Sequence, residues 1–328
     1  MGGDGGVDVT VPACVQILQA NPDLSVFLVG DEHRIEPLLA SVNPQLLSRI
    51  QTLHTAERIK GEDKPGNVLR SAKQSSMYKA VELLKSGDVQ AMVSAGNTGA
   101  LLMIGRHLLK TIPGIQKPAI VATIPGASRQ CYLLDVGANL DCSAQQLFEF
   151  AVMGSVLAES LQGEPARVGL LNIGSEDYKG TDEVREAGEL LERCPALNYT
   201  GFIEANALFE RIADVVVCDG FVGNVTIKSS AGVANVVKKL LTQQLLSDSV
   251  SPDTDEWSSN MLQKLSSLID PHRFNGASLL GLQGSIVKSH GNASSEGFAY
   301  ALQQAITEIE NAVPQLIAKK VAAIIGQS

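Results

Sequence analysis

Glycine-containing polar segments follow five short apolar runs in this sequence of 328 residues. The runs are 91–94, 132–136, 168–172, 215–218 and 285–288, and the segments after them are 95–99, 137–141, 173–176, 219–224 and 289–292. Glycine-rich turns in front of helices expose backbone amides, and such amides bind anions. The pattern therefore predicts an anion site of the phosphate-binding kind, with residues 96–99 and 220–224 as the two best candidates.

Charged side chains occur in or near the same segments. The acidic ones are Asp135, Asp141 and Asp219, and the basic ones are Lys179, Lys228, Lys288 and His290. Each aspartate could equally be a helix cap or a turn residue, and Lys179 and Lys228 could be solvated charges at helix ends. Lys288 and His290 are stronger candidates, because alternation along the end of a strand would direct both into the same crevice.

Several other kinds of chemistry are disfavoured by the sequence. No dinucleotide-binding glycine fingerprint follows the first strand, and neither a P-loop nor the glycine-flanked serine of hydrolases is present. The histidines and aspartates are too scattered for a metal site, and the five cysteines are widely spaced. The net charge of −9 argues against nucleic-acid binding, and no apolar run is long enough to cross a membrane. We therefore expect no metal and no cofactor.

The elements that must position these segments are short buried strands that alternate with helices. Runs rich in Val and Ile suit strands buried on both faces, and the intervening helical stretches predict βαβ units and a mainly parallel sheet. Ligands of open parallel sheets bind beyond the carboxyl ends of the strands. All five polar segments are therefore expected at one edge of the sheet. The length would allow two domains, but no linker divides the chain, so residues 1–328 are read as a single unit.

The helices carry their own signals. Residues 67–86 are predicted as one helix that Gly87 ends, and Ser143 with Gln146 fits a capping box. Apolar residues at helical spacing on both sides of a polar stretch predict an antiparallel helical hairpin over about 232–269. Residues 296–325 are predicted as a closing helical region that breaks at Pro314.

Taken together, the motifs resemble those of the PlsX phosphate acyltransferases of bacterial phospholipid synthesis, in order from Met1 to about residue 305. The motifs that carry the resemblance are Ser75-Ser76-Met77, Ser94 to Ala100, Leu134 to Asn139 with Asp141-Cys142, Met153-Gly154-Ser155, Leu171 to Gly174 with Lys179-Gly180, Val217 to Phe221 with Gly223-Asn224-Val225, Gly276-Ala277, Leu279 to Leu282, and Lys288 to Gly291.

The resemblance implies transfer of a fatty acyl group from acyl carrier protein to inorganic phosphate, which gives acyl phosphate for glycerol-3-phosphate acylation. It also implies a homodimeric α/β/α sandwich, similar to the isocitrate/isopropylmalate dehydrogenase and phosphotransacetylase group. The implied location is cytoplasmic, with weak peripheral contact at the inner face of the cytoplasmic membrane and a glycerol-3-phosphate acyltransferase as a further partner. The acidic hairpin tip, with Asp248, Asp253, Asp255 and Glu256, weakens the case for attraction to anionic lipid.

On this reading Lys288 and His290 stabilise charge or protonate the leaving group, and Lys179 and Asp219 are the further catalytic candidates. The candidates for binding phosphate or the acyl group are Gly96, Asn97, Thr98, Gly99, Asp135, Asn139, Asp141, Asn172, Gly174, Gly220, Gly223 and Asn224. The acidic carrier protein needs a basic patch. Its candidates are Arg70, Lys73, Lys79, Lys238, Lys239 and Arg273.

Three other functions remain open. A relative with the same fold could act as a CoA-dependent phosphotransacetylase or as a metal-dependent hydroxyacid dehydrogenase, although the latter needs clustered aspartates that the sequence does not show. The chain could also be a non-catalytic scaffold at a membrane surface. The Asn and Lys residues in the polar segments argue against lost activity.

The start of the sequence carries one more expectation. In the PlsX family a short apolar strand precedes the Met-Gly-Gly-Asp loop, and this sequence opens with Met1-Gly2-Gly3-Asp4. We therefore expect a strand upstream of Met1. Without it the neighbouring strands would be left with unpaired backbone groups.

Overall fold

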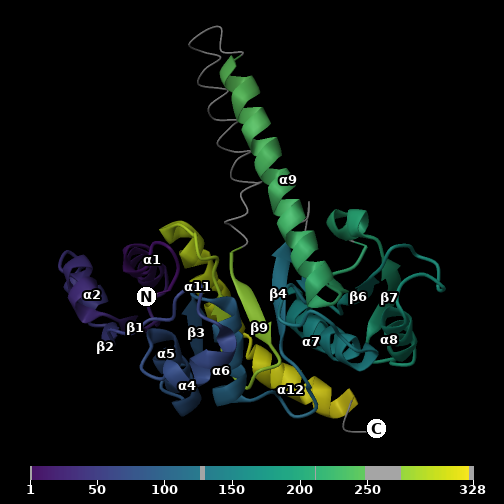
Figure 1. Ribbon diagram of the computed structural model, residues 1–328, viewed down its shortest axis with the longest axis horizontal. Helices are drawn as coiled ribbons and strands as arrows, with labels where there is room; N and C mark the ends of the chain where they lie inside the picture. Colours follow the sequence, from purple (N-terminus) through teal and green to yellow (C-terminus); the bar gives the residue numbers. More distant parts are fainter. Residues whose placement is uncertain (1, 126–129, 211, 248–274, 325–328) are drawn as a thin grey trace.

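The computed structural model describes residues 2–125, 130–210, 212–247 and 275–324. Within these ranges an eight-stranded sheet forms the centre of the molecule, with helices on both of its faces (Figure 1). Its strands, in spatial order, are β3 (Ala91–Ser94), β10 (Ser285–Lys288), β9 (Ala277–Leu280), β4 (Ala119–Ile124), β5 (Cys131–Leu134), β8 (Val215–Val217), β6 (Arg167–Leu171) and β7 (Asn198–Ile203). The predicted α/β architecture is confirmed.

The direction of the strands reverses inside the sheet. β3 and β10 are parallel, β9 is antiparallel to both β10 and β4, and β4 is antiparallel to β5. From β5 onward the neighbours β8, β6 and β7 are all parallel. The sheet is therefore mixed, and β3 and β10 run opposite to β5, β8 and β6. The prediction that all five polar segments share one edge is wrong, because the segments after β3 and β10 lie at the edge opposite to the other three.

Helices cover the two faces of the sheet with separate cores. One core surrounds α7 (Ala144–Gln162), which is buried over most of its length and also contacts α8 (Asp182–Glu192) and α12 (Val313–Ile324). The other lies between the opposite face and the helices α5 (Ser76–Ser86) and α6 (Thr98–Leu109), with the 3-10 helix Ala205–Phe209 at its margin. The capping box of Ser143 and Gln146 is present at the start of α7, as predicted.

A smaller two-stranded sheet lies beside β3. Its strands β1 (Val26–Gly30) and β2 (Ile50–His54) are parallel, and they accompany α1 (Val7–Ala20), α2 (Glu32–Leu39) and α3 (Pro44–Leu47). α1 packs against α11 (Ser295–Glu310), which covers β10 and β3. The first and last parts of the chain thus form one side of the molecule together.

Two helix boundaries differ from the predictions. Residues 67–86 are two helices, α4 (Pro65–Ser71) and α5, because the Ser75 hydroxyl accepts the Tyr78 N–H and starts a new helix after a turn. Gly87 ends α5 in the left-handed conformation, as predicted. The closing region breaks at Asn311 and Ala312 rather than at Pro314, which lies in the first turn of α12 where proline is tolerated.

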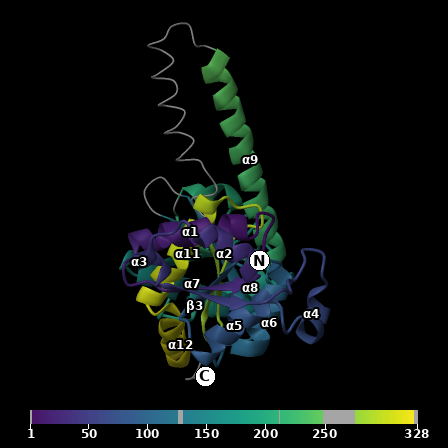
Figure 2. The ribbon, with the colours of Figure 1, turned by 90° about the vertical axis from the view of Figure 1, so that its left-hand side faces the viewer.

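The helix α9 (Gly220–Ser247) projects from the body as a long arm (Figures 1 and 2). It contains the first helix of the predicted hairpin, but it starts at Gly220, because the Asp219 carboxylate accepts the Val222 N–H at 2.8 Å and caps it. The hairpin tip and its second helix lie outside the described residues. None of the described helices is long and apolar enough to span a bilayer.

The buried carboxyl of Glu308 generates a pH prediction for stability. Ser278 and Gln304 donate hydrogen bonds to it, and burial raises its pKa from 4.5 to about 7. Between these values the folded chain keeps a proton that the unfolded chain has lost, so the free energy of unfolding should fall as pH rises through this window, by at most about 3 kcal/mol. Denaturant titrations from pH 4 to 8 should show this slope in the wild type.

The variant Glu308→Gln should lose that slope, while Glu310→Gln, an exposed change on the same helix, should keep it. A wild-type profile that matches Glu308→Gln across the window would contradict the assignment.

Candidate active site

The segments after β3 and β10 meet the N-terminal residues 2–6 in what we call the first loop group. The Ser289 N–H donates to the Ser94 carbonyl at 2.9 Å, and the Asp4 N–H donates to the Gly291 carbonyl at 2.7 Å. A Cβ atom on Gly2 would lie 2.7 Å from the Gly96 nitrogen, so a side chain there would collide with backbone. Three backbone segments therefore approach one another more closely than larger residues would allow.

The start of α6 is the part of the first loop group whose backbone amides could bind an anion. The Asn97 Oδ1 accepts the Ala100 N–H at 3.0 Å, and its Nδ2 donates to the Gly61 carbonyl at 2.9 Å. Asn97 therefore caps the helix and holds the 60–63 segment in place. The amides of Thr98 and Gly99 belong to the first helical turn, where the helix itself offers no acceptor, so they and the helix dipole favour an anion.

Lys288 lies at the end of β10, on the same face of the sheet as α6. Ile286 belongs to the core that contains α6, and Val287 packs against α11 on the other face, so alternation returns Lys288 to the α6 side. Its ammonium group donates to the Ser289 carbonyl, and burial lowers its pKa from 10.5 to about 8. Lys288 is therefore a partly desolvated cation on the face of the sheet that α6 covers.

His290 follows in the turn beyond the strand and is exposed. Its backbone N–H donates to the Asn275 Oδ1 at 2.9 Å, and the buried Asn275 also donates to the Ser289 hydroxyl at 2.8 Å. The backbone around His290 is thus fixed while the residue is open to solvent. The structure places Lys288 and His290 in one loop group, and their shared direction stays a prediction.

The second loop group lies at the other edge of the sheet and is built around Asp135. This side chain is fully buried, and its carboxylate accepts the N–H groups of Ile120, Ala138 and Asn139 at 3.0, 3.0 and 2.7 Å. Burial raises the pKa of Asp135, and these donors oppose the rise. Because both oxygens already have donors, Asp135 organises the segment instead of facing a ligand.

Residues 220–224 are the first turn of α9 rather than a loop, and they press against the Asp135 segment. The Asn224 Nδ2 donates to the Val136 carbonyl at 2.9 Å, and the Gly220 N–H donates to the Asn139 carbonyl at 2.7 Å. A Cβ atom on Gly223 would lie only 1.8 Å from the Asp135 carbonyl oxygen. These glycines are therefore explained by close packing between a helix and a loop.

The segment after β6 completes the second loop group. The Asn172 side chain donates to the Lys179 carbonyl at 3.1 Å and accepts the Ile173 N–H at 2.8 Å, which closes the 172–180 loop. The Lys179 ammonium lies 5.5 Å from the centre of the Tyr178 ring. Gly174 is buried in this loop, whereas Asp141, in the neighbouring segment, is exposed. The side-chain amides of Asn139 and Asn172 thus both donate hydrogen bonds to backbone carbonyls.

Sequence reasoning missed several cations near these groups. Lys117, half-buried before β4, lowers the pKa of the Cys142 thiol, which burial together with Asp135 and Asp219 raises to about 12. The exposed Arg58, Lys60 and Lys64 belong to or flank the segment that Asn97 holds. These residues were missed because they alternate with acidic residues in the sequence. In addition, only the fold shows that this segment lies at the start of α6.

The predicted basic patch for the carrier protein is split between two places. Arg70 and Lys73 are exposed on α4 and the turn after it, and Lys79 on α5 pairs with Glu82 at 3.0 Å. Lys238 and Lys239 lie on the outer half of α9, which both views show far from α4 (Figures 1 and 2). Arg273 lies outside the described residues.

Comparison with known proteins decides the family. The model of a family described as "Fatty acid synthesis protein" matches residues 1–316. The chain belongs to this family. Curated phosphate acyltransferases of Shewanella loihica and Halorhodospira halophila are 46% and 44% identical to it, over 99% of the chain and 96% and 95% of the relatives. The family expected from the motifs is confirmed.

Solved structures share the fold of this family member. A phosphotransacetylase from Streptococcus pyogenes matches with a TM-score of 0.62 at 18% identity, over 94% of this chain and 92% of that one. The EutD phosphotransacetylase from Staphylococcus aureus gives 0.58 at 18% identity, over 92% and 90%. A putative 4-hydroxythreonine-4-phosphate dehydrogenase from Salmonella typhimurium gives 0.51 at 13%, over 94% and 97%. At such identities the likeness shows the fold alone. Among the described residues of this chain, no three His, Cys, Asp or Glu side chains gather where they could hold a metal ion.

The packing role of Gly223 can be tested with a matched pair of glycine substitutions. Gly223→Ala should lower the free energy of unfolding by roughly 3 kcal/mol, because the new methyl group would overlap the Asp135 carbonyl. Gly232→Ala, further along α9, meets no described atom within 4 Å and should raise it by about 0.5–1 kcal/mol. Chemical denaturation of both variants measures the difference. Equal stabilities would show that the helix start can move away from Asp135.

Proposed function

We propose that this chain transfers a fatty acyl group from acyl carrier protein to inorganic phosphate, giving acyl phosphate and free carrier protein. The observation that carries the proposal is the match to phosphate acyltransferases over 99% of the chain at 44–46% identity, within a family described by fatty acid synthesis. The chain is therefore a phosphate acyltransferase, and the carrier-bound thioester is the donor that we propose.

This reaction requires little covalent chemistry from the protein. A phosphate oxygen attacks the thioester carbonyl, the carbon–sulfur bond breaks, and the thiolate of the carrier takes a proton. Phosphate is already an anionic nucleophile, so no acyl-enzyme is needed. The protein must hold phosphate against the carbonyl, stabilise the oxyanion and supply the proton.

The first loop group fits these tasks. The first-turn amides of α6 and the positive end of its dipole would hold phosphate, and the ammonium of Lys288 would balance its charge. The exposed imidazole of His290 would protonate the departing thiolate. The second loop group is a poorer anion site, because it carries Asp135, Asp141 and Asp219 and because much of its hydrogen-bonding capacity already serves the backbone.

The acidic carrier protein would dock beside the same group. Arg70 and Lys73 are exposed near the 58–64 segment, which Asn97 ties to the start of α6. A carrier bound there would present its thioester at the first loop group. Lys238 and Lys239 on α9 form a second basic surface at a distance, which suits a later contact or a different partner. The homodimer, the weak membrane contact and a glycerol-3-phosphate acyltransferase partner stay predictions.

A CoA-dependent phosphotransacetylase is the second candidate, because solved phosphotransacetylases share the fold. Incubating the protein with phosphate and either palmitoyl carrier protein, palmitoyl-CoA or acetyl-CoA separates the two functions. Mass spectrometry should detect palmitoyl phosphate, formed most efficiently from the carrier-bound donor. Efficient formation of acetyl phosphate without activity on the carrier-bound donor would favour the second candidate.

Replacing the two basic residues of the first loop group should reduce turnover. Lys288→Ala and His290→Ala should each lower kcat by roughly 10²-fold or more, the usual scale for the loss of one charge-stabilising or proton-transferring group. Lys179→Ala in the second loop group is the matched control and should stay near wild type. The opposite ranking would move the chemistry to the second group.

The pH profile adds a second readout for Lys288. Because its pKa is about 8, the ammonium loses its proton as pH rises through that value, so phosphate binding should weaken there. Lys288→Arg keeps its charge and should move the loss of phosphate affinity to higher pH.

Neutralising the proposed docking surface should affect only the protein substrate. Arg70→Ala combined with Lys73→Ala should raise KM for acyl carrier protein several-fold and leave KM for phosphate unchanged, because surface charges mainly steer encounter. Lys85→Ala combined with Lys110→Ala, at the far ends of α5 and α6, removes the same charge as a control. An equal rise in KM for both pairs would show a net-charge effect rather than a docking site.

A further inference from the structure

A buried asparagine supports the turn that carries His290. Asn275 precedes β9 and is 3% exposed. Its Oδ1 accepts the His290 N–H at 2.9 Å, and its Nδ2 donates to the Ser289 hydroxyl at 2.8 Å and to the Gly297 carbonyl at 2.7 Å. One side chain therefore engages its oxygen and both of its amide hydrogens with partners that lie 14 to 22 residues further along the chain.

The backbone around Asn275 is itself held in place. The next residue, Gly276, has a φ of 128°, and a Cβ atom there would lie 3.1 Å from the Ala301 Cα, so the start of β9 packs closely against α11. Gly297, which accepts a hydrogen bond from Asn275, lies in the first turn of the same helix. Asn275 therefore joins the start of β9, the turn after β10 and the start of α11.

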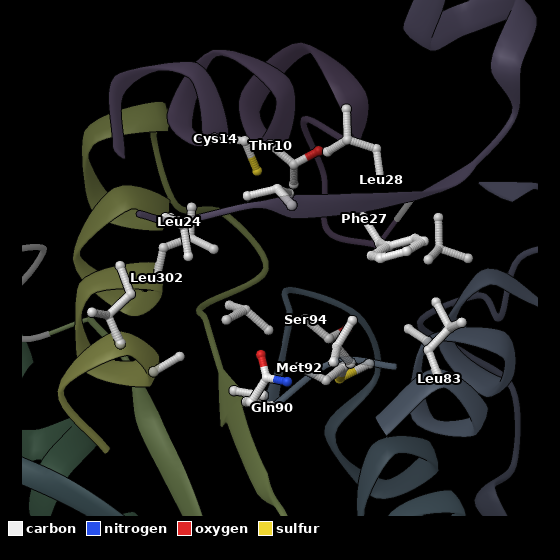
Figure 3. Close-up of a pocket in the computed structure, with 18 of the residues that line it drawn as sticks. Thr10, Cys14, Leu24, Phe27, Leu28, Leu83, Gln90, Met92, Ser94 and Leu302 are labelled. Atoms are coloured by element: carbon white, nitrogen blue, oxygen red, sulfur yellow. The ribbon is translucent and has the colours of Figure 1, made fainter. Parts of the chain in front are cut away.

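The support that the turn receives from β3 is weaker. The Ser289 N–H donates to the Ser94 carbonyl at the end of β3, but among the described residues β3 pairs only with β10. On its other side a cavity of about 700 Å³ separates β3 from β1, and Ser94 lines it (Figure 3). A strand with few packed neighbours opens more easily than a buried one. The place of the turn therefore depends chiefly on Asn275.

His290 depends on this support more than Lys288 does. Lys288 pairs with Ala277 of β9 inside the sheet, whereas His290 lies beyond the last pair and is exposed. The hydrogen bonds to its backbone therefore determine where the imidazole starts. We propose that Asn275 is a positioning residue for the reaction, which holds His290 where it can protonate the departing thiolate. This inference rests on the proposed function, in which His290 is the proton donor.

Loss of the Asn275 side chain should slow turnover without weakening phosphate binding. Asn275→Ala removes the partners of the His290 N–H and the Gly297 carbonyl, and a shift of about 1 Å in a reacting group can cost roughly 10²-fold in rate. We expect kcat with palmitoyl carrier protein to fall by roughly 10- to 100-fold. KM for phosphate should stay unchanged, because Lys288 and the start of α6 keep their places.

Asn311→Ala is the matched control. The Asn311 side chain donates to the Thr307 carbonyl at 2.8 Å, at the other end of α11, so this variant loses a similar hydrogen bond away from the first loop group. Its kcat should equal that of the wild type.

A change of leaving group separates positioning of a proton donor from a general structural role. The alkyl thiolate of palmitoyl carrier protein is basic and needs a proton, whereas the 4-nitrophenyl thioester of palmitate releases an aryl thiolate that is stable as an anion. Asn275→Ala and His290→Ala should therefore both be slow with the first donor and near wild type with the second. The combined variant should be no slower than His290→Ala alone, because both changes remove the same step.

Amide exchange tests the contact directly. Asn275→Ala should speed exchange of the His290 N–H by about tenfold or more, and Asn311→Ala should not. If Asn275→Ala does not fold, Ser289→Ala is the milder variant, because it removes only the hydroxyl that accepts one Asn275 N–H. It should show the same dependence on the donor with a smaller fall in kcat, and wild-type behaviour with both donors would then overturn the inference.

Three results would overturn the inference and leave the proposed function intact: a wild-type kcat in Asn275→Ala beside a slow His290→Ala, equal slowing with both donors, or losses that multiply in the combined variant. A wild-type kcat in His290→Ala would remove the proton donor and the inference together. If the wild type forms palmitoyl phosphate only from palmitoyl-CoA, the proposed donor is wrong, and the same variants compared with palmitoyl-CoA decide the role of Asn275.

Discussion

The buried carboxylate of Asp135 is the interaction on which the arrangement of the second half of the molecule depends. It accepts hydrogen bonds from the start of β4 and from the segment after β5, two pieces of chain that are antiparallel neighbours in the sheet. The backbone carbonyl of Asp135 leaves no space for a side chain at the facing position of α9, which is Gly223. One fully buried ionisable side chain thus sets the position of the β4–β5 pair, the segment after it and the base of the arm.

The reversal of strand direction divides the candidate anion-binding residues between two edges of the sheet. It separates Lys288, His290 and the start of α6 from the acidic segments after β5 and β8. A phosphate ion near the second group would face Asp219 and Asp141, whereas near the first group it meets a helix N-terminus and a partly desolvated ammonium. The antiparallel strands β9 and β4 therefore separate the edge proposed for catalysis from the edge that supports the arm.

Local signals in the sequence were sufficient for the elements that local interactions determine. The apolar runs at 91–94 and 285–288 are strands, Ser143 caps α7, and Gly87 ends α5. An apolar run does not show whether its strand is parallel or antiparallel to its neighbours. The sequence therefore could not show that the polar segments lie at two different edges of the sheet. The split of 67–86 was missed because Ser75 acts through a cap, and helical periodicity across 72–75 hides it.

A glycine in such a loop can be required by close packing or by the approach of a ligand. Only the atoms around the position of its missing Cβ distinguish the two. At Gly99 a Cβ would meet Pro65, and at Gly220 it would meet the Asn139 carbonyl, so both are required by packing whatever else they do. A glycine in these segments therefore indicates that a helix start packs closely against another segment. It does not by itself show that the amides of that helix start bind an anion. The anion site needs a cation as well, and the start of α6 has one, Lys288, on its own face of the sheet. For this reason we propose the first loop group as the place of the reaction, although the glycines alone favour neither edge.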